Sequence, residues 1–165
     1  MILNTYKHIL DKISQDDLDK LKSIIDSYQD IIILGNGGSN AISCHIAEDY
    51  TKALGKRALC FGDSARMSCY ANDYGWEYAY TKYIEHFATK NTLVILISSS
   101  GNSKNILNAA SYCSKKHPMI TMSGFDEINK LNTIYANKSL LHFYVASDDY
   151  GIVECIHELI LHSVI

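Results

Sequence analysis

The sequence lacks the features that would direct a chain into a membrane, out of the cell or onto nucleic acid. No apolar run approaches the roughly 20 residues that cross a bilayer, so we expect no membrane association. The N-terminus lacks the apolar core and the small-residue cleavage site of a signal peptide, which favours a cytoplasmic location. The formal net charge is -3 and no basic patch stands out, so no nucleic-acid partner is expected.

The pattern of the five cysteines argues against two common roles of cysteine, disulfide bonding and zinc binding. They are odd in number and scattered, without a Cys-x-x-Cys pair, which argues against a disulfide framework and a cysteine-type zinc site. The chain also has no repeat, low-complexity tract or linker. Its 165 residues are enough for one core, so we predict a single domain over residues 1–165. Residues 1–28 have helical spacing and precede an α/β core over residues 29–165.

Within this core, apolar runs alternate with helix-like stretches. The predicted strands cover residues 31–34, 58–61, 92–98, 119–123 and 140–145. The predicted helices cover residues 39–54, 76–88, 103–116 and 150 to the end. Continuous apolar strands between helices are typical of a parallel sheet covered on both faces. The expected fold is therefore α/β, a doubly wound five-stranded parallel sheet with an N-terminal helical extension, and its ligands should bind at the carboxyl ends of the strands.

Two small polar loops follow the strands at 31–34 and 92–98. The first is Gly35-Asn36-Gly37-Gly38-Ser39, and the second is Ser98-Ser99-Ser100-Gly101-Asn102-Ser103. A strand, a short polar loop and a helix N-terminus together suit an anion, because free backbone N–H groups and the helix dipole point at it. Neither loop contains Lys or Arg, so hydroxyl groups would hold a phosphate.

Each loop alone also has a simpler interpretation. The first is not a dinucleotide fingerprint, because Asn40 stands where glycine is needed, and no Gly-Lys-Ser/Thr follows to make a P-loop. It is also typical of a tight strand-to-helix turn with a serine N-cap, and the second is also typical of a solvated serine loop. Their equivalent places in two β-α units favour one shared phosphate site.

Carboxylates and histidines recur at helical spacing on two predicted helices. His45 and Asp49 are four residues apart and share a face. The last helix carries a second set in steps of four: Glu154, Glu158 and His162, with His157 beside them. Such groups can transfer protons or bind a metal, although both stripes are also typical of solvated helix faces. In the polar turn at 71–77, Asp73 is a candidate acceptor for a sugar hydroxyl or a helix cap.

These motifs together resemble the SIS (sugar isomerase) domain and, within it, the phosphoheptose isomerases. The matching segments keep the family's order and cover nearly the whole chain: Gly35–Ser39 with His45, Asn72–Gly75, Ser98–Ser103, Thr121–Gly124 and Glu154–His162. The resemblance implies a flavodoxin-like fold and an aldose–ketose isomerase. Members of the family interconvert sedoheptulose 7-phosphate and D-glycero-D-manno-heptose 7-phosphate through a cis-enediol, to supply heptose for surface polysaccharide.

The resemblance also implies roles for individual residues. The phosphate and sugar would be bound by Asn36, Gly37, Gly38, Ser39, Asp73, Ser98, Ser99, Ser100 and Ser103. Asp49 and His162 would be the catalytic acid and base, in an order that the resemblance leaves open. Some members hold zinc, for which the matching residues are His45, Asp49, Glu154 and His162. The family forms homotetramers with sites at subunit interfaces, so an oligomer is expected.

The sequence departs from this family at three places. Asp49 stands where phosphoheptose isomerases usually have Glu, which keeps another phosphosugar as an alternative substrate. Glu154 replaces a usual Gln and makes the site more anionic. His162 lies three residues from the end of the sequence and is expected to need support from a neighbouring subunit. An alternative of another class is a non-catalytic SIS adaptor that binds the bacterial replication initiator, but the complete acid/base set favours an enzyme.

Overall fold

The computed structural model describes residues 2–165 and contains one five-stranded, all-parallel sheet. The strands are β1 (Asp30–Leu34), β2 (Arg57–Cys60), β3 (Thr92–Ser98), β4 (Met119–Gly124) and β5 (Leu141–Val145). Their order across the sheet is β2-β1-β3-β4-β5, with every neighbouring pair parallel. The order reverses between β1 and β3, and the carboxyl edge at such a point is where ligands bind in this fold. The predicted doubly wound sheet is confirmed.

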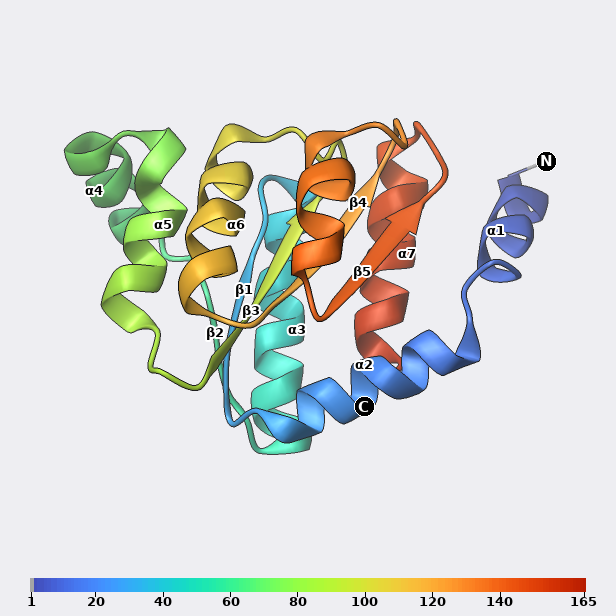
Figure 1. Cartoon of the computed structure of the whole chain (residues 1–165), viewed down its shortest axis with the longest axis horizontal. Helices are drawn as coiled ribbons and strands as arrows, with labels where there is room; N and C mark the ends of the chain where they lie inside the picture. Colours follow the sequence, from blue (N-terminus) through green and yellow to red (C-terminus); the bar gives the residue numbers. More distant parts are fainter. Residues whose placement is uncertain (1) are drawn as a thin grey trace.

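Two layers of helix cover the sheet because alternate strand residues point to opposite faces. Ile33 and Ile95 belong to the core shared with α1 (Ile2–Leu10), α2 (Gln15–Ser27), α3 (Gly38–Leu54) and α7 (Tyr150–His162). Leu34 and Leu96 belong to the core shared with α5 (Trp76–Phe87), α6 (Lys104–Lys116) and a π-helical turn, η1 (Leu131–Tyr135). Figure 1 shows α3 and α7 on one side of the sheet and α5 and α6 on the other.

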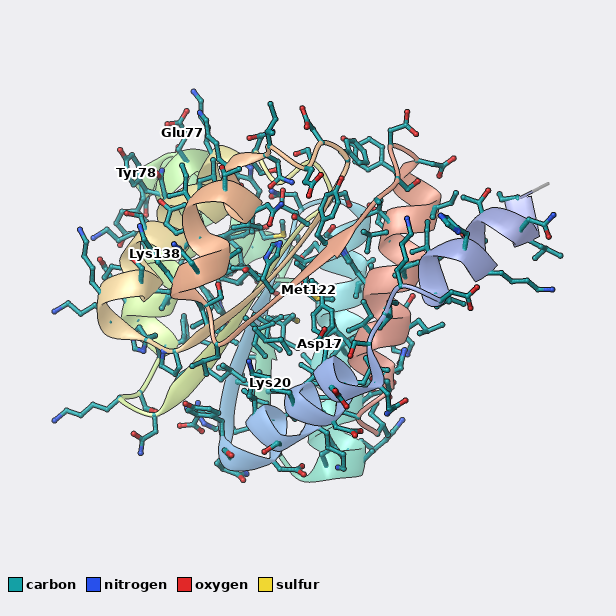
Figure 2. The ribbon with its side chains drawn as sticks, turned by 45° about the vertical axis from the view of Figure 1, so that its right-hand side comes forward. Asp17, Lys20, Glu77, Tyr78, Met122 and Lys138 are labelled. Atoms are coloured by element: carbon teal, nitrogen blue, oxygen red, sulfur yellow. The ribbon has the colours of Figure 1, made fainter. Side chains whose placement is uncertain are left out.

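The side chains follow this layering. Met122 of β4 is fully buried and lies inside the molecule, whereas Glu77 and Tyr78 of α5 project from the surface (Figure 2). All seven residues of β3 are buried, as expected for the central strand of a sheet covered on both faces. Within residues 2–165, no helix is both long and apolar enough to cross a membrane.

Two segments differ from the sequence-based expectation. Residues 62–75 contain a further helix, α4 (Ser64–Tyr74), which was expected to be a loop and a turn. Its start is fixed by Asp63, whose carboxylate accepts a hydrogen bond from the backbone N–H of Arg66 at 2.8 Å. None of its residues is fully buried, and it meets the core only through side chains such as Met67 and Tyr70. The polar stretch between β4 and β5 also folds, into η1 and a 3₁₀ turn, η2 (Ala136–Lys138).

Candidate active site

A cavity of about 340 Å³ opens at the carboxyl ends of β1 and β3. Both polar loops line it, together with two residues of α7. The lining residues are Asn36, Gly37, Gly38, Ser39, Ile97, Ser98, Ser99, Ser100, Ser103, Tyr150 and Glu154. The structure therefore brings together eight of the nine residues expected to bind phosphate and sugar. The ninth, Asp73, lies near the end of α4, where its carboxylate contacts Cys69 and Asn72, and it neither lines the cavity nor caps a helix.

The first loop is fixed by hydrogen bonds from α5 and α6. The hydroxyl of Tyr80 donates to the backbone oxygen of Gly35, and it lies 3.0 Å from Oδ1 of Asn36. The amides of Asn36 and Asn105 bond reciprocally, at 2.9 and 2.8 Å. Gly37, with φ of 55°, is the N-cap of α3, so no serine side chain caps this helix. No motif in the sequence pointed to Asn105, a buried residue of α6.

The second loop presents hydroxyl groups to the same cavity. Ser98 Oγ donates to Ser103 Oγ at 3.2 Å, and the backbone oxygen of Ser99 accepts from Gly124 N–H at 2.9 Å. Ser103 is the N-cap of α6, but its side chain makes no capping bond. The hydroxyl of Ser99 is buried and has no hydrogen-bond partner among the described residues. A buried polar atom without a partner is uncommon in a folded chain, so this hydroxyl is suited to a ligand.

Gly101 gives this loop its shape, and Gly101→Ala is expected to destabilise the fold by roughly 2–4 kcal/mol. Its φ is 62°, and an added Cβ would overlap the buried amide of Asn129, which holds the start of η1. Gly55→Ala is the matched control, because Gly55 has a φ of 64° with open space around it, so only backbone strain of about 1 kcal/mol should remain. Urea unfolding of both variants measures the difference. If both variants lost the same free energy of unfolding, Asn129 would be shown to move aside at no energetic cost.

Glu154 lies between this cavity and an adjoining groove. The groove, of about 400 Å³, runs between α3 and α7 and shares Gly38 and Glu154 with the cavity. An added Cβ at Gly38 would overlap the Glu154 carboxylate, so glycine leaves the space that this side chain occupies. Burial raises the pKa of Glu154 above its ordinary value, because the charged form is less well solvated there.

Three predicted site residues meet around His45, which lines this groove. Asp49 Oδ2 lies 3.2 Å from His45 Nε2 and 3.1 Å from His162 Nε2. Lys52 Nζ lies 3.5 Å from the other oxygen of Asp49. The hydrogen bond from His162 is the main reason that the pKa of Asp49 lies below its ordinary value. The two imidazole rings stand edge to face, with centroids 5.0 Å apart. The cluster joins α3 and α7 through one carboxylate.

This cluster fits a metal ion. One ligand atom from each of His45, Asp49 and His162 lies within 4.8 Å of the others. Ligands about 2.0–2.1 Å from a tetrahedral zinc are about 3.3 Å apart, close to the two separations from Asp49 Oδ2. Glu154, expected as the fourth ligand, is not part of the group and lines the cavity instead. Glu158 contacts the cluster, with Oε1 at 2.7 Å from His45 Nδ1.

His162 is the last residue of α7 and is supported by its own chain. The Tyr50 hydroxyl of α3 donates to the backbone oxygen of Leu161 at 2.8 Å, and Val164 is buried in the core. These contacts, together with the hydrogen bond to Asp49, hold the end of the helix. The expected need for support from a neighbouring subunit is therefore met within the chain.

Comparisons with known proteins identify relatives of this chain. No family model matches the chain. A phosphoheptose isomerase of Fusobacterium nucleatum is 30% identical over 151 residues, which cover 88% of this chain and 76% of that protein. One of Glaesserella parasuis is 36% identical over 112 residues, which cover 62% of this chain and 58% of that protein. The structure of phosphoheptose isomerase GmhA from Neisseria gonorrhoeae superposes with a TM-score of 0.84 at 22% identity, covering 96% and 88% of the two chains.

The parallel sheet, with two polar loops at its carboxyl edge, defines a sugar-isomerase (SIS) domain. The aligned length and identity to the Fusobacterium protein go further: the chain belongs to the phosphoheptose isomerase family. The matched segment spans between about half and three quarters of the lengths of such relatives.

Proposed function

We propose that the protein is an aldose–ketose isomerase that acts on a phosphorylated sugar. The observation that carries this proposal is that the cavity and the groove adjoin each other at Gly38 and Glu154. A molecule anchored at the serine loops would extend past Glu154 along α3 toward His45. An anion site at one end and a cluster of imidazoles and a carboxylate at the other match a substrate with phosphate and carbonyl at opposite ends.

The phosphate would be bound by hydroxyl groups and helix N-termini. The hydroxyl of Ser103 does not cap α6. The hydroxyl of Ser99 has no hydrogen-bond partner among the described residues. Both hydroxyl groups can therefore bind a phosphate. Backbone N–H groups at the start of α6, together with its dipole, add attraction for the anion. Neither loop contains Lys or Arg, so the hydrogen bonds themselves would provide the specificity.

Asp49 and His162 would then move protons between C1 and C2. A base takes a proton from C1 of the ketose, the electron pair forms the C1–C2 double bond, and the C2 carbonyl oxygen gains a proton. The resulting cis-enediol returns a proton to C2 and loses one from the C1 oxygen, which gives the aldose. The hydrogen bond from His162 lowers the pKa of Asp49, so this group is a carboxylate at neutral pH and can accept a proton. The two groups already share a hydrogen bond of 3.1 Å, through which they can exchange a proton.

As an alternative to proton transfer by the metal-free pair, His45, Asp49 and His162 would hold a zinc ion, with Glu154 lying toward the substrate. Asp49 and His162 would then be ligands of that ion and not a free acid and base. When bound, such an ion polarises the carbonyl and hydroxyl oxygens of a sugar. Three protein ligands leave a position open, as catalytic zinc sites require. Glu154 would instead restrict the room beside the sugar and contribute negative charge.

We propose sedoheptulose 7-phosphate as the substrate and D-glycero-D-manno-heptose 7-phosphate as the product, as the resemblance of the sequence motifs implies. The proposal includes a homotetramer in which a neighbouring subunit brings Asp73 to the substrate, because Asp73 of the same chain lies outside the cavity. It also includes a cytoplasmic location, which five free thiols support.

Incubation with a panel of ketose phosphates, followed by NMR of the products, tests this function. Sedoheptulose 7-phosphate should yield the heptose phosphate, and in D₂O the product should carry deuterium at C2. If only a different ketose phosphate were converted, the proposed reaction would stand and the proposed substrate would be wrong. Absence of any conversion, with chelator and with added zinc, would contradict the isomerase and favour a binding protein.

Ser103→Ala is expected to weaken phosphosugar binding by roughly 1–3 kcal/mol, because one charge-assisted hydrogen bond is lost. The Michaelis constant should rise about 5- to 150-fold while turnover changes less. Ser114→Ala, at the exposed far end of the same helix, is the matched control, since its hydroxyl bonds only the backbone oxygen of Ser111. An unchanged Michaelis constant for Ser103→Ala would remove this hydroxyl from the phosphate site.

A further inference from the structure

His45 is held between two carboxylates that approach opposite nitrogens of its ring. Its Nε2 lies 3.2 Å from Asp49 Oδ2, and its Nδ1 lies 2.7 Å from Glu158 Oε1. Asp49 is on α3, four residues beyond His45, whereas Glu158 is on α7. The contact to Glu158 is the shortest of those made by the cluster.

We infer that Glu158 is a positioning residue, which fixes His45 so that its Nε2 faces Asp49 and His162. This inference rests on the proposed function, because it assigns a role within the same site. A neutral imidazole carries one proton, and a carboxylate accepts it. The contact to Glu158 is shorter than that to Asp49, and Asp49 Oδ2 also has His162 Nε2 as a donor, so we place the proton on Nδ1. The proton position on one imidazole nitrogen sets the state of the other, which leaves the Nε2 lone pair directed at the cluster.

Glu158 itself is not a ligand in this arrangement. Its Oε1 meets the Nδ1 side of the ring, opposite the Nε2 atom that faces Asp49, so one ion cannot contact both Glu158 Oε1 and His45 Nε2 at bonding distance. Carboxylates that bind the second nitrogen of a metal-ligating histidine orient the ring and increase its basicity. Glu158 would therefore act on the metal indirectly, by binding the ring nitrogen of His45 that does not face the ion.

The contact between His45 and Glu158 contributes little to the stability of the fold. The side chains of His45 and Glu158 are 55% and 34% exposed, and exposed pairs contribute little to stability. Apart from Asp49 and the ring of His162, little packs against the ring of His45, because this side chain is exposed. Glu158 thus supplies orientation where packing does not, and removing it should alter metal affinity far more than stability.

The experiment measures zinc affinity and the state of the His45 ring in Glu158→Ala and Glu158→Gln. Competition of zinc chloride with a chromophoric chelator should give an affinity 10- to 100-fold below that of the wild type for Glu158→Ala. Glu158→Gln keeps an oxygen that accepts from Nδ1–H and should lie between the two. Glu48→Ala is the matched control, because it removes an equal charge beside Asp49, and Glu48 makes no hydrogen bond or ion pair with the cluster among residues 2–165.

Nitrogen-15 NMR of the metal-free proteins at pH 8 reports the ring directly and needs neither zinc nor substrate. The wild type and Glu158→Gln should show His45 with its proton on Nδ1, and Glu158→Ala should lose this preference. A wild type that binds no zinc but shows the Nδ1 proton would sink the metal site and keep the positioning role. Wild-type ring signals in Glu158→Ala, or equal zinc affinity of a folded Glu158→Ala, would overturn it.

Discussion

Replacing His162 with alanine is expected to slow turnover by about 10²–10⁴-fold, the usual effect of removing a group that transfers protons. His162 bonds Asp49 at 3.1 Å and belongs to the cluster of His45, Asp49 and His162. Its side chain is 35% exposed, so alanine leaves no enclosed apolar cavity. The variant should therefore remain folded, with a loss of about 1 kcal/mol from the missing hydrogen bond.

Isomerisation of sedoheptulose 7-phosphate, followed beside thermal melts, checks this expectation. His86→Ala is the matched control, because His86 is also exposed and bonds a single side chain, the hydroxyl of Tyr70 at 2.7 Å. His86 does not line the cavity or the groove, so its loss should leave turnover unchanged. Near-equal rates for the wild type and a well-folded His162→Ala would exclude His162 from the chemistry.

The second large effect is a loss of stability between about pH 6.5 and pH 4. His157 of α7 is fully buried, and burial lowers its pKa to about 4. Its Nε2 lies 3.1 Å from the backbone oxygen of Ser123, while its Nδ1 is buried without a partner among residues 2–165, so a second proton would have no acceptor there. Burial also lowers the pKa of His142 to about 4, although that ring is partly exposed and bonds Thr121.

The sign of the pH dependence follows from comparing the pKa values of the folded and the unfolded chain. In the unfolded chain these imidazoles titrate near 6.5. Between pH 6.5 and 4 the unfolded state therefore binds more protons, and acid favours unfolding. The stabilisation is present above pH 6.5 and is lost as the pH falls through that range. Glu154 acts in the opposite sense, because its raised pKa makes the folded state take up a proton first.

Urea unfolding in the presence of chelator at pH 7 and pH 5 measures this loss. His157 alone should contribute about 2 kcal/mol over that interval, and His142 less. His157→Gln can still donate to Ser123 and should show a smaller difference between the two pH values. His8→Gln, on the exposed surface of α1, controls for the loss of an imidazole. An equal pH dependence in wild type and His157→Gln would contradict the assignment.

Most of the fold could be predicted because each strand is a continuous apolar run and each major helix carries an apolar stripe. Ile31–Leu34 and Leu93–Ile97 are unambiguous in this sense. Helix α4 was not found in this way, because its contact with the core is limited to side chains such as Met67 and Tyr70, which are not fully buried. Its one sequence signal is Asp63, a helix N-cap that also fits a turn.

Prediction of the candidate site had a different limit. Motif spacing identified His45, Asp49 and His162, which share two helix faces and meet in the structure. Spacing could not decide which glutamate of α7 meets His45, since Glu154 and Glu158 are one turn apart on the same face. That choice depends on how far α7 is shifted along α3, and this shift is set by tertiary packing.

The paired amides of Asn36 and Asn105 have a consequence for how this sequence can change over generations. The two side chains satisfy each other across the loops, and they also accept from the Tyr80 hydroxyl and from a backbone N–H of α6. A lineage that alters one of them leaves its buried partner with unmet donors and acceptors, which is costly. Substitutions at these two positions should therefore arise together or be followed by compensation, and descendants that retain both loops should inherit the pair as a unit.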